Sequence, residues 1–438
     1  MRVFFILLAI TLPILAQVGN IYDEAPEIEA PYFQVRYEAS TEADGLKFPV
    51  RYTVWIPENI ETLRGVIVHQ HGCGTGSAKS GLTGAFDLHW QALARKHGCA
   101  LLSPTYEYEE DRSCAIWCDP TQGSDAAFQQ GLADLGELSG HPELAEVPWA
   151  LWGHSGGAFW SAIMTALHPD RIAATWMRSG ALPMEQRPDR EEVKLYEVTA
   201  AMLAVPMMAN LGTGEGVTVK EGRFAGVWPA AELFIGKVRE MGGLAAISID
   251  PLTDHQCGNQ RYLAMPWFDA CLSARLPENH GAPMRKIDPA SGVLVPFHQG
   301  ESVAIAGFTG DPAKMGWLPN QKIADAWETY VIDTTIADTT PPPAPLDLKL
   351  SENGTLSWQA HADLESGIEG FVIKRKGEII GELPRKNRNP FGRPLFQGLQ
   401  YSDTPSFPLQ KMEFIDPEPA ESVDAYEVVA KNTAGLSS

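Results

Sequence analysis

Basic side chains are scarce in this sequence. Its 438 residues include 34 Lys and Arg against 55 Asp and Glu, which gives a formal net charge of −21 at pH 7. A strongly acidic protein repels phosphate backbones and anionic lipid headgroups. The charge balance therefore argues against nucleic acid as a partner and against binding to membranes by charge.

Long apolar runs and paired C-x-x-C units are also lacking. Beyond the N-terminus no apolar run approaches the roughly 18 residues that a spanning helix needs. The missing cysteine pairs argue against a zinc site, and no other motif implies a metal or an organic cofactor. The hydrophobic content of 44% is ample for a core, so we expect a globular protein of two or three domains.

The N-terminus is the exception to this lack of long apolar runs. Arg2 precedes an apolar run from Val3 to Leu15, Ala16 follows, and the chain then turns acidic. This order is typical of a signal peptide, which we expect to span residues 1–16 and to be cleaved after Ala16. The mature protein is then secreted or periplasmic, and it has no remaining membrane segment.

Short apolar runs alternate with amphipathic ones over residues 32–280, which predicts an α/β domain with a mostly parallel sheet covered by helices. The runs at 32–38 and 49–56 are expected to be antiparallel edge strands. The other predicted strands are 66–69, 100–104, 148–152, 173–177, 206–211 and 244–249, and the predicted helices are 90–97, 125–138, 158–167, 230–241 and 260–274. Residues 278–337 are rich in Gly and Pro and receive no firm assignment, apart from a last helix at 321–330 that would dock on this domain.

The C-terminal part has a different pattern. A proline-rich stretch at 338–345 predicts a linker, so the α/β domain is assigned to residues 17–337. Over residues 346–438, strand-like runs separated by turns predict a small all-β sandwich, with strands at 346–350, 355–359, 370–375, 378–383 and 425–431. Within it, the runs Thr355–Trp358 and Tyr426–Gly435 resemble fibronectin type III domains, although a long insertion at 386–410 departs from that pattern.

The sharpest local motif is Gly153-His154-Ser155-Gly156-Gly157, a G-x-S-x-G match. A predicted strand enters it and a predicted helix leaves it, which is the context of a nucleophile elbow. The glycines allow the sharp turn that exposes the serine hydroxyl above the sheet. Ser155 is therefore the predicted nucleophile, and His154 is expected to pack or hydrogen-bond inside the turn.

A serine nucleophile needs a histidine base held by a carboxylate, and after an elbow these follow in the order Ser, acid, His. His255 lies just beyond a late predicted strand and is the best candidate for the base; His280 and His298 are weaker. Glu215 follows the strand at 206–211 and is the best-placed acid, with Glu221 and Asp254 as rivals.

An oxyanion formed at Ser155 also needs two backbone N–H donors. The residue after the nucleophile, Gly156, supplies one. The predicted strand at 66–69 runs into His71-Gly72-Cys73-Gly74, a glycine-rich turn whose amides can face a ligand. We assign the second donor to Cys73.

Together these residues resemble an α/β-hydrolase of the secreted esterase and depolymerase branch. The resemblance covers residues 32–280, and it implies hydrolysis of carboxylic esters through an acyl-enzyme. The acid is Glu where the branch more commonly has Asp, and no long insertion resembles a lipase lid. The expected substrate is an ester, soluble or polymeric, such as an ester-decorated polysaccharide, with the C-terminal domain as a spacer or polymer binder.

Three other functions remain open at this point. A polyester depolymerase or a serine peptidase could use the same triad, and a non-catalytic surface or adhesion protein could keep the scaffold. Acyl group, alcohol and oligomeric state are not determined by any motif.

Two groups of side chains near the motifs have open roles. The six cysteines allow up to three disulfides, which we expect to pin the active-site loops, since Cys73 and Cys257 lie beside catalytic elements. The aromatic residues could stack on a substrate or simply pack in the core. They are Trp117, Trp149, Trp152, Phe159 and Trp160.

Overall fold

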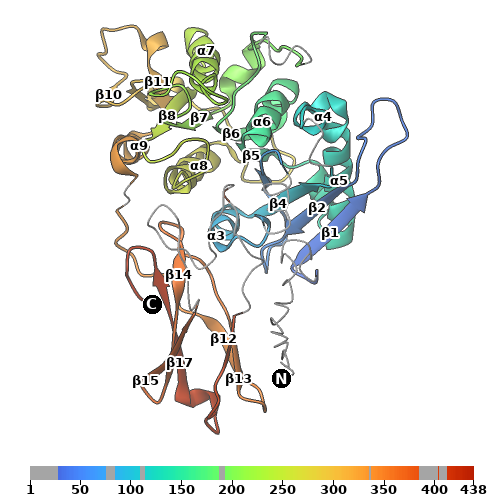
Figure 1. The fold of residues 1–438 in the computed structure, drawn as a ribbon, viewed down its shortest axis with the longest axis vertical. Coiled ribbons are helices and arrows are strands. Elements are labelled where there is room, and N and C mark those ends of the chain that lie inside the picture. The colour runs from blue at the N-terminus through green and yellow to red at the C-terminus, as the bar shows by residue number, and fades with distance from the viewer. Residues whose placement is uncertain are drawn as a thin grey trace, which may run out of the picture.

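The computed structural model describes residues 28–74, 84–108, 114–186, 193–334, 337–383, 403 and 412–438. Figure 1 shows an α/β domain formed by the N-terminal three quarters of the chain, and a smaller, elongated β domain formed by its C-terminal end. The predicted signal peptide, residues 1–16, and most of the insertion at 386–410 lie outside the described residues. Within the described part, no helix is long and apolar enough to cross a membrane.

The α/β domain is built on an eight-stranded sheet of order β1-β2-β4-β3-β5-β6-β7-β8. Strands β1 and β2 are antiparallel to their neighbours, and the pairs from β4 to β8 are parallel. Its strands are β1 (Tyr32–Tyr37), β2 (Val50–Trp55), β3 (Gly65–Gln70), β4 (Cys99–Tyr106), β5 (Trp149–His154), β6 (Ile172–Arg178), β7 (Met207–Gly212) and β8 (Ala245–Asp250). Strands β3 to β8 are buried along their whole length, which explains their continuous apolar runs.

Helices cover both faces of this sheet and enclose two hydrophobic cores. One core packs α5 (Ser124–Ser139), α6 (Gly156–Leu167) and α7 (Val227–Glu240) against one face. The other packs α3 (Leu88–His97), α8 (Arg261–Arg275) and α9 (Gln321–Asp333) against the opposite face. A short helix, α4 (Ala115–Cys118), precedes α5. The arrangement confirms the predicted α/β-hydrolase fold.

The stretch left without a firm assignment contains a small antiparallel sheet of order β10-β9-β11. Its strands are β9 (Val293–Val295), β10 (Val303–Ala304) and β11 (Gly316–Leu318). A strand of two or three residues is too short to show the alternation of apolar and polar residues by which a strand is predicted from sequence. Helix α9 follows and docks on the large sheet, where the indole of Trp327 donates to the carbonyl of Ile247 at 2.8 Å.

In its described residues, the C-terminal domain is a sandwich of two three-stranded antiparallel sheets, of orders β12-β13-β16 and β15-β14-β17. Its strands are β12 (Leu346–Leu350), β13 (Thr355–Gln359), β14 (Ile368–Arg375), β15 (Glu378–Leu383), β16 (Glu413–Ile415) and β17 (Tyr426–Asn432). Trp358 and Phe371 pack between the sheets. The Tyr426 hydroxyl accepts from Ala420 N at 2.9 Å, as the tyrosine corner of many β-sandwiches does. The sequence missed only the three-residue strand β16 among these.

Candidate active site

Ser155 occupies the turn between β5 and α6. Its φ of 54° and ψ of −116° lie outside the backbone regions that non-glycine residues favour. Its N–H donates to Arg178 O on β6 at 2.8 Å. Such a backbone outlier is the geometry of a nucleophile elbow, which raises the serine hydroxyl above the carboxyl ends of the strands.

Two glycines make this turn possible because backbone segments pass very close to them. A Cβ on Gly153 would lie 2.1 Å from Gly157 O. A Cβ on Gly157 would lie 2.4 Å from both Gln70 O and His71 O, at the end of β3. The elbow and the glycine-rich turn after β3 are therefore in direct backbone contact.

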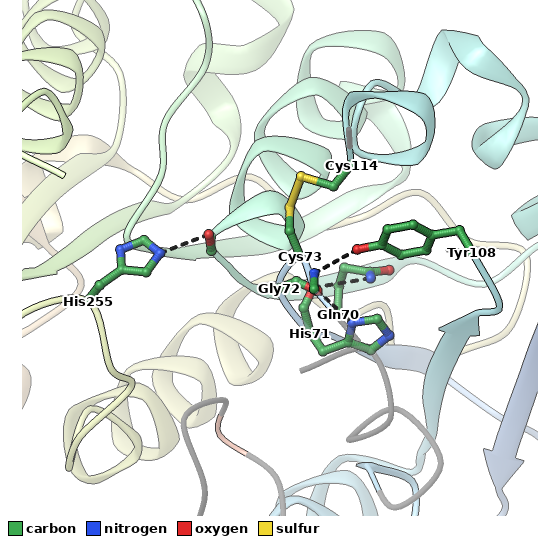
Figure 2. The surroundings of a disulfide bond; sticks show 9 residues. Gln70, His71, Gly72, Cys73, Tyr108, Cys114 and His255 are labelled. Carbon is green, nitrogen blue, oxygen red and sulfur yellow. Dashed lines mark hydrogen bonds between the residues drawn. A yellow bond between two sulfur atoms is a disulfide. The ribbon is translucent and has the colours of Figure 1, made fainter. Parts of the chain in front are cut away.

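His255 bridges the serine and a carboxylate. Its Nε2 lies 2.9 Å from Ser155 Oγ, and its Nδ1 hydrogen-bonds to Oε1 of Glu215. Figure 2 shows the His255 imidazole with the hydrogen bond that one of its ring nitrogens makes. Because a carboxylate only accepts, Nδ1 carries a proton in this pair, which leaves Nε2 able to accept the serine proton.

Glu215 lies three residues beyond β7 and is fully buried. Its second carboxylate oxygen, Oε2, accepts from Gly212 N and from Ser179 Oγ, each at 2.8 Å. These two donors hold the carboxylate so that Oε1 faces the imidazole. The rival acids Glu221 and Asp254 are both exposed at the surface.

Arg178 is a buried residue of this site that the sequence analysis missed. Its guanidinium donates to Thr253 Oγ1 at 2.9 Å and to the backbone carbonyls of Asp254 and Gln256, on both sides of His255. Burial alone would lower the pKa of Arg178, but the nearby Glu215 and Asp250 charges raise it above its usual value. The permanently charged side chain thus ties the histidine loop to the end of β6.

Phe224 is a second residue that no motif indicated. Its ring stacks on the His255 imidazole, with centroids 3.7 Å apart and planes 8° from parallel. It comes from the loop between β7 and α7, 31 positions before the histidine in the sequence. A single aromatic residue in a polar loop carries no period or motif that could reveal such a contact.

The two proposed N–H donors lie on adjoining segments. Gly156 opens α6, and the first N–H groups of a helix have no intrahelical acceptor. Cys73 lies in the turn after β3, and its sulfur is so near that a Cβ on Gly156 would lie 2.2 Å from it. Gly74 N donates to the hydroxyl of Tyr108 at 2.7 Å, which is a further support of the turn.

One disulfide fastens this turn. Cys73 is bonded to Cys114, which immediately precedes α4 (Figure 2). The expectation of a disulfide at an active-site loop is thus met for the turn after β3. It is wrong for the histidine loop, because Cys257 is a buried free thiol.

The remaining histidines take other positions. Burial lowers the pKa of His154 well below its usual value and that of His71 to about 4, so both stay neutral. His154 Nε2–H donates to His255 O at 2.8 Å, which adds a second support to the histidine loop. His280 and His298 are exposed.

The tryptophans near the motifs pack in the core. Trp117, Trp149, Trp152 and Trp160 are all fully buried, so the stacking interpretation does not hold for them. Phe159, on α6, is partly exposed. The rings build the two cores on either side of the sheet that carries Ser155.

Among the described residues, one cluster of acidic side chains could hold a metal ion: Asp338, Asp363 and Glu365. The amide nitrogen of Asn432 lies among them and donates to Asp338 Oδ2 at 2.9 Å and to Asp363 Oδ2 at 3.0 Å. The amide cannot turn its oxygen inward, because that oxygen accepts from Ala434 N and Leu436 N. A hydrogen-bond donor therefore takes the place that a cation would need.

Comparison with known proteins gives fold-level similarity. No family model and no curated protein sequence matches the chain. Among solved structures, it is similar to poly(aspartic acid) hydrolase-1 from Sphingomonas sp. KT-1, at 16% identity and a TM-score of 0.37 over 51% of this chain and 93% of that one. It is also similar to a ferulic acid esterase, at 14% identity and a TM-score of 0.36 over 51% and 90% of the two chains. A third is FphF, a fluorophosphonate-binding serine hydrolase of Staphylococcus aureus, at 13% identity and a TM-score of 0.32 over 51% and 91%.

The contact between Glu215 and His255 leads to a first prediction. In Glu215→Gln the amide lacks the charge that stabilises an imidazolium, so we expect kcat to fall by roughly 10³- to 10⁴-fold. Asp254→Asn removes the charge of an exposed carboxylate next to the histidine and should leave kcat within about twofold of wild type. Steady-state hydrolysis of a chromogenic ester measures both. A larger loss in Asp254→Asn would reassign the acid.

The close approach at Gly157 leads to a second prediction. Gly157→Ala places a methyl group against two carbonyl oxygens, so it should destabilise the protein by several kcal/mol and abolish turnover. Gly236→Ala is the matched control: it lies within α7, and a Cβ there meets nothing within 4 Å. That variant should be as stable as wild type or up to about 1 kcal/mol more stable. Thermal unfolding compares the two.

The disulfide leads to a third prediction. Cys114→Ala opens a bridge between residues 41 positions apart but keeps the backbone of Cys73, and loop-closure entropy predicts a loss of about 4 kcal/mol. The melting temperature should fall accordingly. A reductant should lower the melting temperature of the wild type and leave that of the variant unchanged. Equal sensitivity in both proteins would contradict the bridge.

Proposed function

We propose that this protein is an exported serine hydrolase that cleaves carboxylic esters through an acyl-enzyme. The observation that carries the proposal is the bridging position of His255, with one ring nitrogen 2.9 Å from Ser155 Oγ and the other bonded to the buried Glu215. Such an array turns a weakly nucleophilic hydroxyl into an effective one.

The proposed reaction begins when Ser155 Oγ attacks the ester carbonyl while His255 Nε2 takes the serine proton. Glu215 stabilises the imidazolium that forms. The backbone N–H groups of Gly156 and Cys73 stabilise the oxyanion. Collapse of the tetrahedral intermediate breaks the bond to the alcohol, which receives the proton from His255. Water activated by the same imidazole then releases the acid and restores the serine.

The surroundings of the site support a preorganised centre. The base and the acid are held in place before any substrate arrives. Arg178 and His154 hydrogen-bond to the loop that carries His255, and Gly212 N donates to Glu215. Ser155 itself remains partly exposed, so a substrate can reach its hydroxyl. A rigid, accessible arrangement of this kind lowers the reorganisation needed in the transition state.

The proposal also covers the location of the protein and its substrate class. A signal peptide at residues 1–16 would export the protein to the periplasm or the medium, where the disulfide at Cys73 is stable. An exported esterase with an appended β domain suits an ester-bearing polymer, and we propose ester-decorated polysaccharide as the substrate class.

A panel of small chromogenic esters (acetyl, butyryl, octanoyl and feruloyl) tests this function in the wild type and in Ser155→Ala. We expect turnover in the wild type, and at least roughly 10³-fold less in the variant, with its melting temperature unchanged. Turnover that survives in Ser155→Ala would overturn the assignment. A silent wild type whose serine still takes up a fluorophosphonate would point to a peptidase. A silent and unlabelled wild type would favour a binding protein on the same scaffold.

A further inference from the structure

Asp403 belongs to the C-terminal part of the chain by sequence, between β15 and β16, but its side chain is buried against the α/β domain. The residue is 0% exposed. Its carboxylate accepts from Trp90 Nε1 on α3 at 3.0 Å and from Arg261 Nε on α8 at 2.9 Å. Neither donor belongs to the C-terminal domain.

Arg261 joins this carboxylate to a second one. Its Nη2 donates to Asp87 Oδ2 at 2.8 Å and to the backbone oxygen of Asp403 at 3.1 Å. Asp87 in turn caps α3 by accepting from His89 N and Trp90 N. Although burial alone would raise the pKa of Asp403, the Arg261 guanidinium lowers it to about 2, so the carboxylate stays charged.

The elements that Asp403 touches are those that carry the candidate active site. Arg261 is the first residue of α8, six positions after His255. Cys257, two positions after His255, is buried, and its burial together with the nearby Asp403 charge raises the pKa of its thiol. His69 Nε2, at the end of β3 just before the turn with Cys73, lies 3.7 Å from Asp403 Oδ2.

A ring stack connects the same carboxylate to the elbow. His69 stacks on Trp152, with centroids 4.0 Å apart and planes 18° from parallel. Trp152 lies on β5, three residues before Ser155, and its indole donates to Gln260 Oε1 at 3.1 Å. Strand β3, strand β5 and the start of α8 therefore meet around one buried anion.

We propose that Asp403 is a positioning residue, a carboxylate supplied by the C-terminal part of the chain that holds the end of β3 and the start of α8 so that the Cys73 turn and the His255 loop face Ser155. This role rests on the proposed hydrolase function. It also makes the C-terminal domain part of the catalytic unit, where the sequence predicted a spacer or a polymer binder.

The isosteric variant Asp403→Asn tests this role in the full-length protein. An amide has one acceptor oxygen, so its NH₂ group must face either Trp90 Nε1 or Arg261 Nε, and a donor then meets a donor. We expect kcat for the best ester of the panel to fall on the order of 10- to 100-fold, because small displacements of catalytic groups cost this much. KM should change by less than about twofold, since no substrate contact is removed.

Asp416→Asn is the matched control. Asp416 is also a buried carboxylate of the C-terminal domain, but its partners Arg375 and Tyr426 belong to that domain. This variant should keep wild-type kcat and KM. The rate at which Ser155 reacts with a fluorophosphonate provides a second readout, and it should slow in Asp403→Asn alone. Circular dichroism confirms that each variant is folded at the assay temperature.

The outcomes separate the two proposals. An active wild type with unchanged kcat and labelling rate in Asp403→Asn overturns the positioning role and leaves the hydrolase function intact. An equal loss in Asp416→Asn also overturns it, because folding of the C-terminal domain would then explain the effect. A wild type that neither hydrolyses the esters nor takes up the label overturns the hydrolase function, and the positioning role falls with it.

Discussion

The architecture of the site depends on the close approach of other backbone segments to Gly153 and Gly157. Without side chains at these two positions, the end of β5, the start of α6 and the turn after β3 come within contact distance of one another. Ser155 can then adopt its unusual backbone conformation, and the N-terminus of α6 adjoins the Cys73 turn. Every other contact of the site is arranged around this junction, since the base, the acid and the donors must all reach a hydroxyl whose position the turn determines.

Buried charges of opposite sign lie close to one another around this junction. Glu215 is buried next to His255, and the buried Arg178 lies close enough to neutralise part of its charge. On the side of the sheet that α8 and α9 cover, Arg261 lies between Asp87 and Asp403. A charged group removed from water is tolerated when partners of opposite sign and hydrogen bonds surround it, and both arginines meet that condition. The acidic net charge of the chain therefore coexists with an interior in which carboxylates and guanidinium groups are paired.

The fold was largely predictable from the sequence because β3 to β8 are continuous apolar runs and the intervening helices show amphipathic periods. The short strands β9 to β11 and β16 were not, since two or three residues cannot display a period. Within the site, Ser155, Glu215 and His255 could be predicted because each lies in the loop that follows a strand and the three occur in a recognised order. Arg178 and Phe224 could not, because their roles arise from contacts between segments 31 to 78 residues apart that no local pattern records.

The contact at Asp403 bears on how such a protein can change over evolutionary time. Domains that only share a linker can be exchanged by recombination, and each keeps its own history. Here an exchange at the proline-rich boundary would leave Trp90 Nε1 and Arg261 Nε facing a position without its acceptor. The two parts of the chain are therefore expected to be inherited together, and substitutions at residues 87, 90, 261 and 403 to accompany one another across descendants.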